Sequence, residues 1–525
     1  MLTKVSSAGL IGTEGYIVAC ETDVSDGLPA FNMIGQLSSS VKESQDRVKT
    51  AIHNTGFTIN SAKITVNLAP AAVKKEGTGY DLAIAVSVLS SYGYFNNDFA
   101  RRLMKESVFL GELSLSGKLL KIPGVLSLAL AAKEAGYKNI FVPSANAVEG
   151  AVIEGIRCYG IDTLYEIARI LDQEITLPEP SKYIDEPVDY ADDVDFADIC
   201  GQEVVKRATI IAVAGRHNIL YIGPAGTGKS MIAKRIPGIL PQMSKNERLE
   251  ISKLYSICGL LPEEEPLLSS RPYRQPHHTI SAQALNGGGT VPKPGEISLA
   301  SGGVLFLDEL AEFKPSVIDS IRQPMEDKKV LISRVHSSLE FPADFVLCAA
   351  TNPCKCGFYP DKTKCNCTEL QVRSYLGKIS KPVLDRIDIC IETAPPKYNE
   401  LRTKGGDISS SEIRFQIERV REIQYKRLNS LGINFNSEMN NKMIDEFCVL
   451  SESDNKFLEN YYNLKGISAR GLSKILKVAR TIADYDDSDI ITHEHLCEAM
   501  MYRNLEDKYW GGGDRIESRF RTRTV

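Results

Sequence analysis

The chain has 525 residues, too many for one hydrophobic core, so we expect two to four domains. With 43% hydrophobic and 25% charged residues it has a globular composition, which excludes a disordered or fibrous protein. The formal net charge is only −5, so any contact with nucleic acid has to be local. No apolar run approaches the ~20 residues that span a bilayer, and the N-terminus lacks a signal peptide. Twelve cysteines in such a chain predict thiols or metal ligands, a cytoplasmic location and no membrane partner.

The N-terminal third, residues 1–172, mixes strand-like and helix-like segments and predicts an α+β domain. Residues 62–68 alternate between apolar and polar, as a half-buried strand does. Residues 80–91 form an apolar stretch long enough for a buried helix. Residues 126–135 are amphipathic, and Gly136 suits the C-cap of that helix.

A phosphate-binding loop is the clearest motif in the chain. The apolar run 219–222 predicts a buried strand, the pattern G-x-x-x-x-G-K-S follows at once, and the next residues suit a helix. The alternative, a glycine-rich turn with a chance lysine, does not account for this context. Lys229 can reach the β- and γ-phosphates, and the Ser230 hydroxyl can hold Mg²⁺. The predicted nucleotide-binding residues are Gly223, Pro224, Ala225, Gly226, Thr227, Gly228, Lys229 and Ser230.

Two acids and an asparagine complete the predicted site. Asp308 and Glu309 follow the apolar strand 304–307 at its carboxyl end, where α/β proteins bind ligands. Asp308 would hold Mg²⁺, directly or through water, and Glu309 would orient and deprotonate the attacking water. Asn352 follows the strand-like residues 345–350, so we expect it beside the second strand, within reach of the γ-phosphate or the water.

Two arginines are candidates for stabilising negative charge on the transferring phosphoryl group. Arg386 follows a helix-like turn and could act on the nucleotide of a neighbouring subunit; the alternative is a salt bridge to Asp385 or Asp388. Arg470 precedes the predicted helix 472–483, from which it could reach the same phosphates as part of a lid domain.

These motifs resemble the AAA+ ATPases, more narrowly their magnesium-chelatase-like branch and the YifB/ComM family. The likeness is carried by residues 274–279, 287–300, 351–357 and 384–388, and it extends over the whole chain. It implies a homo-hexameric ring that hydrolyses ATP with Mg²⁺. It also implies action on single-stranded or branched DNA, as a helicase or in branch migration, during homologous recombination or natural transformation. Recombination proteins are candidate partners.

The N-terminal domain resembles the proteolytic domain of Lon-type proteases at residues 111–124 and 131–136. Those enzymes use a serine nucleophile activated by a lysine. The two positions fall at about Gly79 and Leu128, and neither side chain can attack a carbonyl or take a proton. The resemblance therefore implies the fold without the protease chemistry.

The segment 326–342 predicts a β-hairpin that carries several basic side chains. In related motors such a hairpin points into the central pore, where six copies would form a basic collar for DNA phosphates. The alternative is an exposed hairpin with ordinary surface lysines. The candidate DNA contacts are Lys328, Lys329, Arg334 and His336. The pair His277–His278 lacks two further ligands at metal spacing and is more typical of a structural or loop contact.

Four thiols within fourteen residues predict a metal site. They can close a tetrahedral S₄ site, and thiolates suit Zn²⁺ in a structural role. The C-x-C spacing is tighter than usual, and the alternative is a small loop of free thiols. The candidate ligands are Cys354, Cys356, Cys365 and Cys367.

The sequence thus predicts an α/β protein in three parts. These are a Lon-protease-like α+β domain without the Ser/Lys dyad (1–172), a P-loop AAA+ α/β core with a parallel sheet (198–400) and a helical lid domain (401–510). An acidic linker (173–197) joins the first two, and a basic tail (511–525) follows the lid. Competing hypotheses are a magnesium-chelatase-type subunit for metal insertion, an ATP-dependent protease or chaperone, and a non-motor scaffold.

Overall fold

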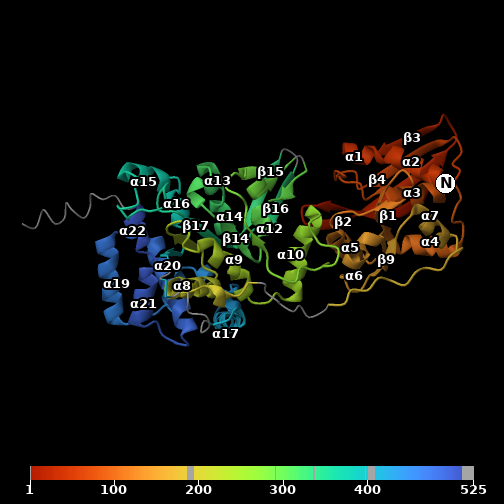
Figure 1. Cartoon of the computed structure of the whole chain (residues 1–525). Coiled ribbons are helices and arrows are strands. Elements are labelled where there is room, and N and C mark those ends of the chain that lie inside the picture. The colour runs from red at the N-terminus through yellow and green to blue at the C-terminus, as the bar shows by residue number, and fades with distance from the viewer. Residues whose placement is uncertain are drawn as a thin grey trace, which may run out of the picture.

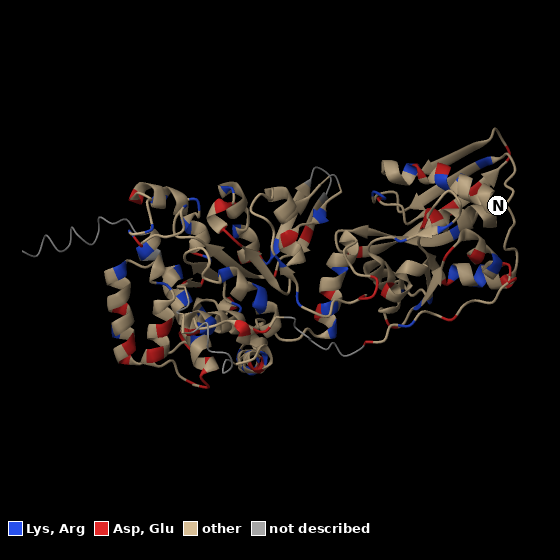
Figure 2. Ribbon diagram, in the orientation of Figure 1, with Lys and Arg blue, Asp and Glu red and all other residues tan. Residues whose placement is uncertain are grey.

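The computed structural model describes residues 2–185, 194–289, 291–334, 337–395, 398–399 and 408–510. Figure 1 shows a row of three parts: an N-terminal sheet with its helices, a central sheet, and a helical C-terminal part. Basic and acidic residues are interspersed over all three, in line with the small net charge (Figure 2). Within the described residues, no helix has both the length and the apolar composition needed to cross a bilayer.

The N-terminal part is built on a mixed seven-stranded sheet in the order β3-β4-β2-β1-β5-β8-β9. The neighbours β1–β2 and β2–β4 are antiparallel, and the remaining pairs are parallel. The strands are β1 (Thr3–Ile11), β2 (Glu14–Ser25), β3 (Ala30–Ile34), β4 (Lys63–Ala69), β5 (Ser107–Phe109), β8 (Asn139–Pro143) and β9 (Arg157–Ile161). A separate short pair is β6 (Glu112–Leu113) and β7 (Leu119–Leu120).

The helices of this part cover the sheet, and the predicted elements are present. The strand expected at 62–68 is β4, and the helix expected at 80–91 is α3, which packs on β1 and β2 and is buried along nearly its whole length. The helices are α1 (Ser39–Lys42), α2 (Ser44–Asn54), α3 (Asp81–Ser91), α4 (Asp98–Lys105), α5 (Val125–Glu134), α6 (Ala147–Ala151) and α7 (Leu164–Leu171).

The central part contains a five-stranded, all-parallel sheet in the order β11-β14-β17-β10-β18. Its three middle strands are apolar and fully buried, as is typical of a sheet covered on both faces. The strands are β10 (Ile219–Ile222), β11 (Tyr273–Arg274), β14 (Val304–Leu307), β17 (Val346–Thr351) and β18 (Ile389–Glu392).

Two small hairpins project from this part. The glycine-rich stretch 287–295 contains β12 (Gly287–Gly288) paired with β13 (Lys293–Pro294), and the predicted basic hairpin is β15 (Lys329–Arg334) paired with β16 (Ser337–Pro342). The helices around the sheet are α8 (Glu203–Gly215), α9 (Lys229–Ile239), α10 (Lys245–Cys258), α11 (Ala282–Asn286), α12 (Glu296–Leu299), α13 (Pro315–Ser320), α14 (Arg322–Asp327), α15 (Glu369–Leu376) and α16 (Lys381–Leu384).

The C-terminal part is helical, as predicted. A capping box formed by Ser409 and Glu412 starts its first long helix, α17. A serine also caps α20, where the Ser468 hydroxyl accepts a hydrogen bond from the Gly471 N–H. The helices are α17 (Ser410–Leu428), α18 (Asn441–Phe447), α19 (Glu452–Lys465), α20 (Ala469–Tyr485), α21 (His493–Met501) and α22 (Leu505–Trp510).

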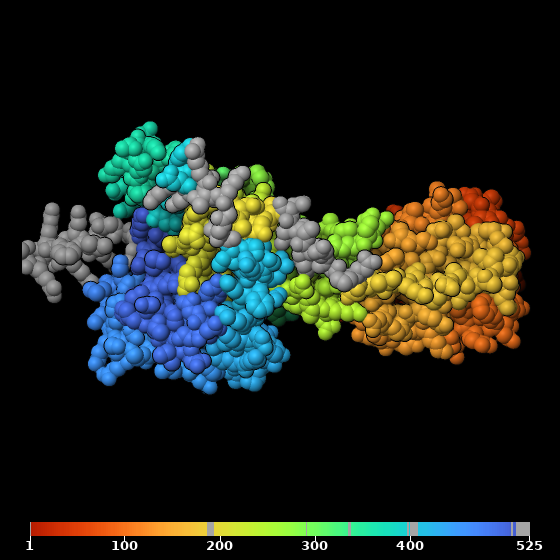
Figure 3. Space-filling view, turned by 60° about the horizontal axis from the view of Figure 1, so that its bottom comes forward, coloured from red at the N-terminus to blue at the C-terminus, as the bar shows by residue number. Residues whose placement is uncertain are grey.

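Helix α10 joins the N-terminal and central parts. It packs on α5, and buried apolar residues of both helices belong to one continuous cluster. Gly124 N–H donates to Ser256 O at 3.1 Å, and the Ser256 hydroxyl donates to Glu149 of α6. This junction is the narrowest section of the molecule in the space-filling view (Figure 3).

Residues 173–185 of the predicted linker contact both the N-terminal part and α10. Ser181 N–H donates to Cys158 O at 2.8 Å, which ties the segment to β9. Asp185 forms an ion pair with Arg248 of α10 at 2.6 Å. Residues 186–193 and the predicted basic tail lie outside the described residues.

Candidate functional site

The phosphate loop lies between the carboxyl end of β10 and the start of α9, as the strand–loop–helix pattern predicts. Gly226 and Gly228 have φ values of +80° and +82°, a left-handed backbone that favours glycine. Gly223 has no room for a side chain, because a Cβ there would lie 2.2 Å from Thr393 Oγ1. The loop therefore needs glycine for conformation at two positions and for close packing at a third.

The Lys229 side chain turns back into this loop. Its ammonium donates to the carbonyl oxygens of Gly223 (2.7 Å) and Pro224 (2.8 Å) and to Asn352 Oδ1 (3.2 Å). Burial lowers the pKa of the ammonium to about 8, although the nearby Asp308 carboxylate favours the charged form. Phosphate oxygens are charged acceptors and can replace the two carbonyl oxygens with stronger hydrogen bonds.

The sheet order places three polar groups at one edge. Strands β14, β17 and β10 are neighbours, so Asp308, Asn352 and the phosphate loop lie side by side at the carboxyl ends of the strands. Asn352 is thus beside the second strand, as predicted. The Ser230 hydroxyl donates to Asp308 Oδ2 at 2.7 Å, which brings together a hydroxyl and a carboxylate of the kind that hold Mg²⁺ beside phosphates.

Glu309 has a fixed backbone and a carboxylate close to a histidine. Its φ is +53°, and its N–H donates to Asp308 Oδ1 at 3.0 Å. The carboxylate favours the charged form of Lys229 and lies 3.5 Å from His278 Nδ1, measured from Glu309 Oε2. The histidine pair therefore has a contact at the nucleotide site, which its sequence spacing did not indicate.

Arg386 and Arg470 meet at one glutamate. Arg386 Nη2 lies 2.7 Å and Arg470 Nη2 lies 3.7 Å from Glu326 Oε1. Both line a cavity of about 710 Å³, whose lining contains no residue of the phosphate loop 223–230. Of the two alternative partners predicted for Arg386, Asp388 is paired with Lys474 at 2.9 Å. The two arginines thus form a unit separate from Lys229.

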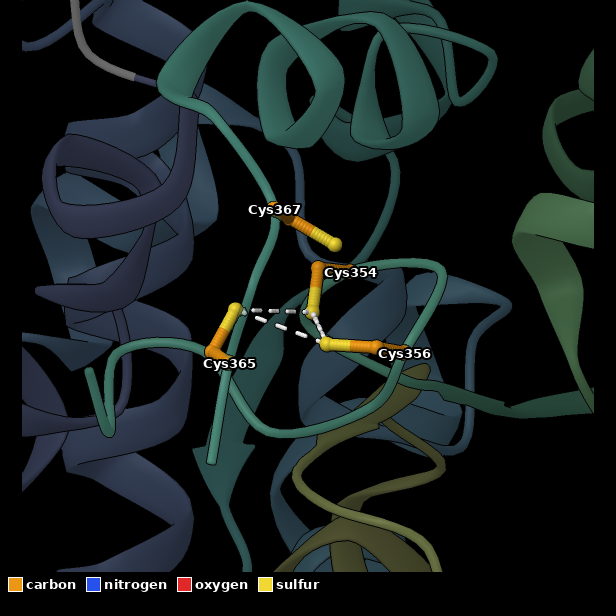
Figure 4. Close-up of side chains that lie close together, drawn as sticks. All are labelled: Cys354, Cys356, Cys365 and Cys367. Atoms are coloured by element: carbon orange, nitrogen blue, oxygen red, sulfur yellow. Dashed lines mark hydrogen bonds between the residues drawn. The ribbon is translucent and has the colours of Figure 1, made fainter. Parts of the chain in front are cut away.

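The four cysteines predicted as metal ligands converge (Figure 4). Their sulfur atoms all lie within 4.8 Å of one another, and three of the separations are 3.3, 3.5 and 3.7 Å. Tetrahedral zinc with Zn–S bonds of about 2.3 Å requires sulfur separations of about 3.8 Å. A hydrogen bond from the Phe358 backbone N–H lowers the pKa of the Cys356 thiol, which favours a thiolate there, whereas the neighbouring thiols raise the pKa of Cys365 and Cys367. Distances and donor set therefore fit Zn²⁺.

The cysteine loop lies against the phosphate loop. Cys354 comes two residues after Asn352, and a Cβ on Gly357 would lie 3.6 Å from the backbone nitrogen of Ala225. Tyr359, in the same loop, packs edge-on to Tyr509 of α22 with ring centroids 6.3 Å apart. The candidate metal site therefore touches the nucleotide site on one side and the last described helix on the other.

The candidate DNA contacts differ from one another in their surroundings. Lys328 lies at the base of the hairpin and forms ion pairs with Asp344 at 3.2 Å and with Glu438. Lys329 is half exposed and pairs across the hairpin with Glu340 at 3.1 Å. Arg334 pairs in register with Ser337 at the hairpin end, while the Arg334 side chain and His336 lie outside the described residues.

The two positions that correspond to the serine and lysine of Lon-type proteases carry glycine and leucine. Gly79 precedes α3, and Leu128 is buried in α5. The nearby hydroxyls are engaged elsewhere: Ser127 donates to Thr13 O at 2.7 Å, and Thr78 donates to Glu112. Within the described part of the chain, neither hydroxyl is bonded to a lysine.

Several residues at the site carry no signal in the sequence. Thr393, which follows β18, shares a 2.7 Å hydrogen bond with Thr227, and Gln202 donates to Thr227 O at 2.7 Å. Thr393 is brought to the loop by the sheet order, because β18 is the neighbour of β10, and Gln202 by its place at the start of α8. His278 stands out as part of a pair, but its partner, Glu309, does not follow from that pair.

Comparison with known proteins identifies related families. A family model described as "Magnesium chelatase, subunit ChlI" matches residues 195–401, "Subunit ChlI of Mg-chelatase" matches 20–146, and "Magnesium chelatase, subunit ChlI C-terminal" matches 407–503. A shorter match, 28% identical over 224 residues, covers 37% of this chain and 39% of Lon protease 2 of Bacillus subtilis.

Two relatives match nearly end to end. Competence protein ComM of Haemophilus influenzae is 39% identical over 511 residues, covering 96% of this chain and 98% of the relative. The "Uncharacterized protein YifB" of Escherichia coli is 39% identical over 508 residues, covering 96% of this chain and 97% of the relative. The chain therefore belongs to the YifB/ComM family of magnesium-chelatase-like AAA+ ATPases.

Proposed function

We propose that the chain is one subunit of a homo-hexameric ring that hydrolyses ATP between subunits and moves on single-stranded or branched DNA. The task it fits best is branch migration or helicase activity in homologous recombination or natural transformation. One observation carries the ring: Arg386 and Arg470 gather at Glu326, in a cavity that no phosphate-loop residue lines. Arginines placed away from their own phosphate loop are suited to act on that of a neighbour, and such head-to-tail packing closes into a ring.

Each group at the site has a role in this proposal. The phosphate loop binds the β- and γ-phosphates, with Lys229 exchanging its carbonyl partners for phosphate oxygens. Ser230 and Asp308 hold Mg²⁺, which when bound neutralises phosphate charge. Glu309 orients and deprotonates the water, Asn352 contacts the γ-phosphate or the water, and the arginines of the next subunit stabilise the charge that develops.

The cysteine cluster adds a structural zinc site to the proposal. The four sulfur atoms supply all four positions of a tetrahedral ion, so no position is left for a substrate. The ion would brace the loop that follows Asn352 and touches Ala225. Its role is therefore to hold the nucleotide site in shape and not to take part in hydrolysis.

The DNA-motor proposal is favoured over metal insertion by the kind of relative that matches. The chelatase models match segments, whereas the relative named for competence matches 96% of the chain. Protease activity is disfavoured by Gly79 and Leu128, and the N-terminal part is proposed to be a Lon-like platform. The protein is proposed to act in the cytoplasm. Hydrolysis measured with forked, four-way and linear DNA separates a DNA motor, which DNA stimulates, from a metal-insertion subunit.

Mixed rings test the shared site directly. Subunits carrying Glu309→Gln and subunits carrying Arg386→Ala should each bind ATP and form inactive rings, because each removes one half of every site. Mixed in equal amounts, they should regain hydrolysis, because roughly a quarter of the interfaces then combine two intact halves. The measurement is steady-state phosphate release against mixing ratio.

A matched mixture shows that recovery comes from the interface. Glu309→Gln and Lys229→Ala both damage the same half of the site, so their mixture must stay inactive. If Glu309→Gln and Arg386→Ala subunits assemble together without regaining hydrolysis, the shared site is wrong and the ring motor with it.

A further inference from the structure

We propose that His278 is a positioning residue for hydrolysis, one that holds the Glu309 carboxylate in the orientation from which it takes the proton of the attacking water. The inference rests on the proposed function, since it takes Glu309 as the general base. It assigns a role to one member of the His277–His278 pair that the nucleotide site otherwise leaves unused.

The sheet brings the two residues together from distant parts of the chain. Strands β11 and β14 are parallel neighbours, with Tyr273 opposite Val304 and Arg274 opposite Leu305. Parallel neighbours end at the same edge, so the segment that follows β11 runs beside the segment that follows β14. Arg274 is fixed at this edge by two hydrogen bonds to Glu296 of α12, at 2.6 and 2.8 Å.

The contact itself is specific to His278. Its Nδ1 lies 3.5 Å from Glu309 Oε2, and the two side chains are 33% and 53% exposed. The His278 ring is held between His277, with centroids 4.1 Å apart, and Phe313, with centroids 6.4 Å apart and the rings nearly perpendicular. The neighbouring His277 points its own Nδ1 at Thr279 Oγ1, 2.9 Å away, so it serves its loop and not the carboxylate.

The physical need for such a contact follows from the freedom of glutamate. The Glu309 backbone is fixed by its φ of +53° and its bond to Asp308, but the side chain has three rotatable bonds beyond it. An exposed carboxylate samples many rotamers, and a general base acts only when it lies within hydrogen-bond reach of the proton it removes. His278 Nδ1 lies beside one carboxylate oxygen of Glu309, and packing against His277 and Phe313 holds the His278 ring in place. The contact therefore selects one orientation of the carboxylate and leaves its other oxygen for the water.

Paired phenylalanine variants separate the nitrogen from the ring. His278→Phe keeps the packing against Phe313 but removes Nδ1, and we expect kcat to fall on the order of 10- to 100-fold while KM for ATP stays unchanged. His277→Phe makes the same chemical change one residue away and should leave kcat as in the unchanged protein. His278→Asn places an amide nitrogen close to the position of Nδ1 and should restore most of the activity. Ring assembly and ATP binding of each variant confirm that it is folded.

The outcomes distinguish this inference from the proposed function. If Glu309→Gln retains full hydrolysis, Glu309 is not the base and both proposals fail. If Glu309→Gln is inactive while His278→Phe is as active as His277→Phe, the base assignment stands and the positioning role is overturned. Equal losses in His278→Phe and His278→Asn, or a loss seen mainly as a raised KM, also overturn it, because they indicate loop packing. Adding His278→Phe to Glu309→Gln should remove no further activity.

Discussion

Lys229 shows how burial prepares the phosphate loop at the scale of one residue. Its ammonium is enclosed among neutral carbonyl oxygens, which stabilise the charge less well than water does, and its pKa falls to about 8. Phosphate oxygens carry negative charge, so they favour the protonated amine. Nucleotide binding and protonation of Lys229 are therefore linked: binding raises the lysine pKa, and loss of the proton weakens binding.

ATP affinity should fall as the pH rises through about 8. For a pKa of about 8, the charged fraction of Lys229 drops about tenfold between pH 7 and pH 9, so the Kd for ATP should rise by about the same factor. Calorimetric titrations in buffers of different ionisation enthalpy should show proton uptake on binding near pH 8. Lys229→Arg stays charged throughout and should bind with a Kd that does not change over this range. A constant Kd for the unchanged protein would contradict the linkage.

The residues of the site divide according to whether their partners are close in sequence. Lys229 and Ser230 were predictable, because the strand, the loop and the helix that form the phosphate site are consecutive in the sequence. Thr393 and His278 were not, because each becomes part of the site only through the order of the strands. For Arg386, the alternative to a role at a neighbouring subunit was an ion pair with Asp385 or Asp388, yet the carboxylate that reaches it is Glu326.

At the scale of elements, the cysteine loop connects the phosphate loop with α22, two elements that are far apart in the sequence. It begins two residues after Asn352, touches the phosphate loop at Ala225 and packs on α22 through Tyr359 and Tyr509. Four thiols at these separations hold the loop well only when a cation joins them, because thiolates repel one another. Removal of the metal should therefore weaken nucleotide binding.

Purified protein should contain about one zinc ion per chain. Replacing Cys354 and Cys356 with serine should remove the zinc and lower the thermal midpoint, by about 2–4 °C for each kcal/mol by which the free energy of unfolding falls in a domain of this size. It should also weaken ATP binding, because the Gly357 segment is no longer held against the phosphate loop. Cys200→Ser changes a free thiol outside the cluster and is the control. Metal-free protein of unchanged stability would rule out the site.

Elements with a strong periodic pattern were predictable, and short ones were not. The buried strands β10 and β14 and the helices α3 and α17 have runs or periods that fix their type. Strand β11 is only two residues long, and two residues carry no period. The contact between the central and C-terminal parts could not be predicted either. Lys474 of α20 and Asp388 are far apart in sequence and form their ion pair only in the folded chain. This pair connects the strand segment of Arg386 to the helix of Arg470.

At the scale of the whole molecule, the N-terminal part is attached firmly to the ATPase core. The buried cluster shared by α5 and α10, the Gly124–Ser256 hydrogen bond and the ion pair of Lys121 with Glu263 at 3.1 Å all cross the junction. Because this contact is packed and hydrogen-bonded, the N-terminal part should move together with α10 when the core changes shape. The N-terminal part is therefore not a domain on a loose tether.

In the proposed hexamer the basic hairpin would occur six times, so the effect of its cationic side chains would depend on assembly. Lys328 is paired with Asp344 and Glu438 at the hairpin base, whereas Lys329 begins β15 and is paired across the hairpin with Glu340, and Arg334 ends that strand. Replacing Lys329 and Arg334 with alanine should weaken DNA binding and reduce the slope of log K against log salt by about one for each phosphate that the variant no longer neutralises. Lys328→Ala should leave that slope unchanged.

The control for this experiment is a pair of exposed lysines remote from the hairpin. Lys426 and Lys456 lie on the lid helices α17 and α19, each paired with a glutamate one turn away, as Lys329 is paired with Glu340. Their double alanine variant removes the same charge per subunit, so a general effect of net charge would lower DNA affinity equally in both. If the hairpin variant and the lid variant have the same affinity and the same salt slope, the hairpin is not the proposed DNA contact.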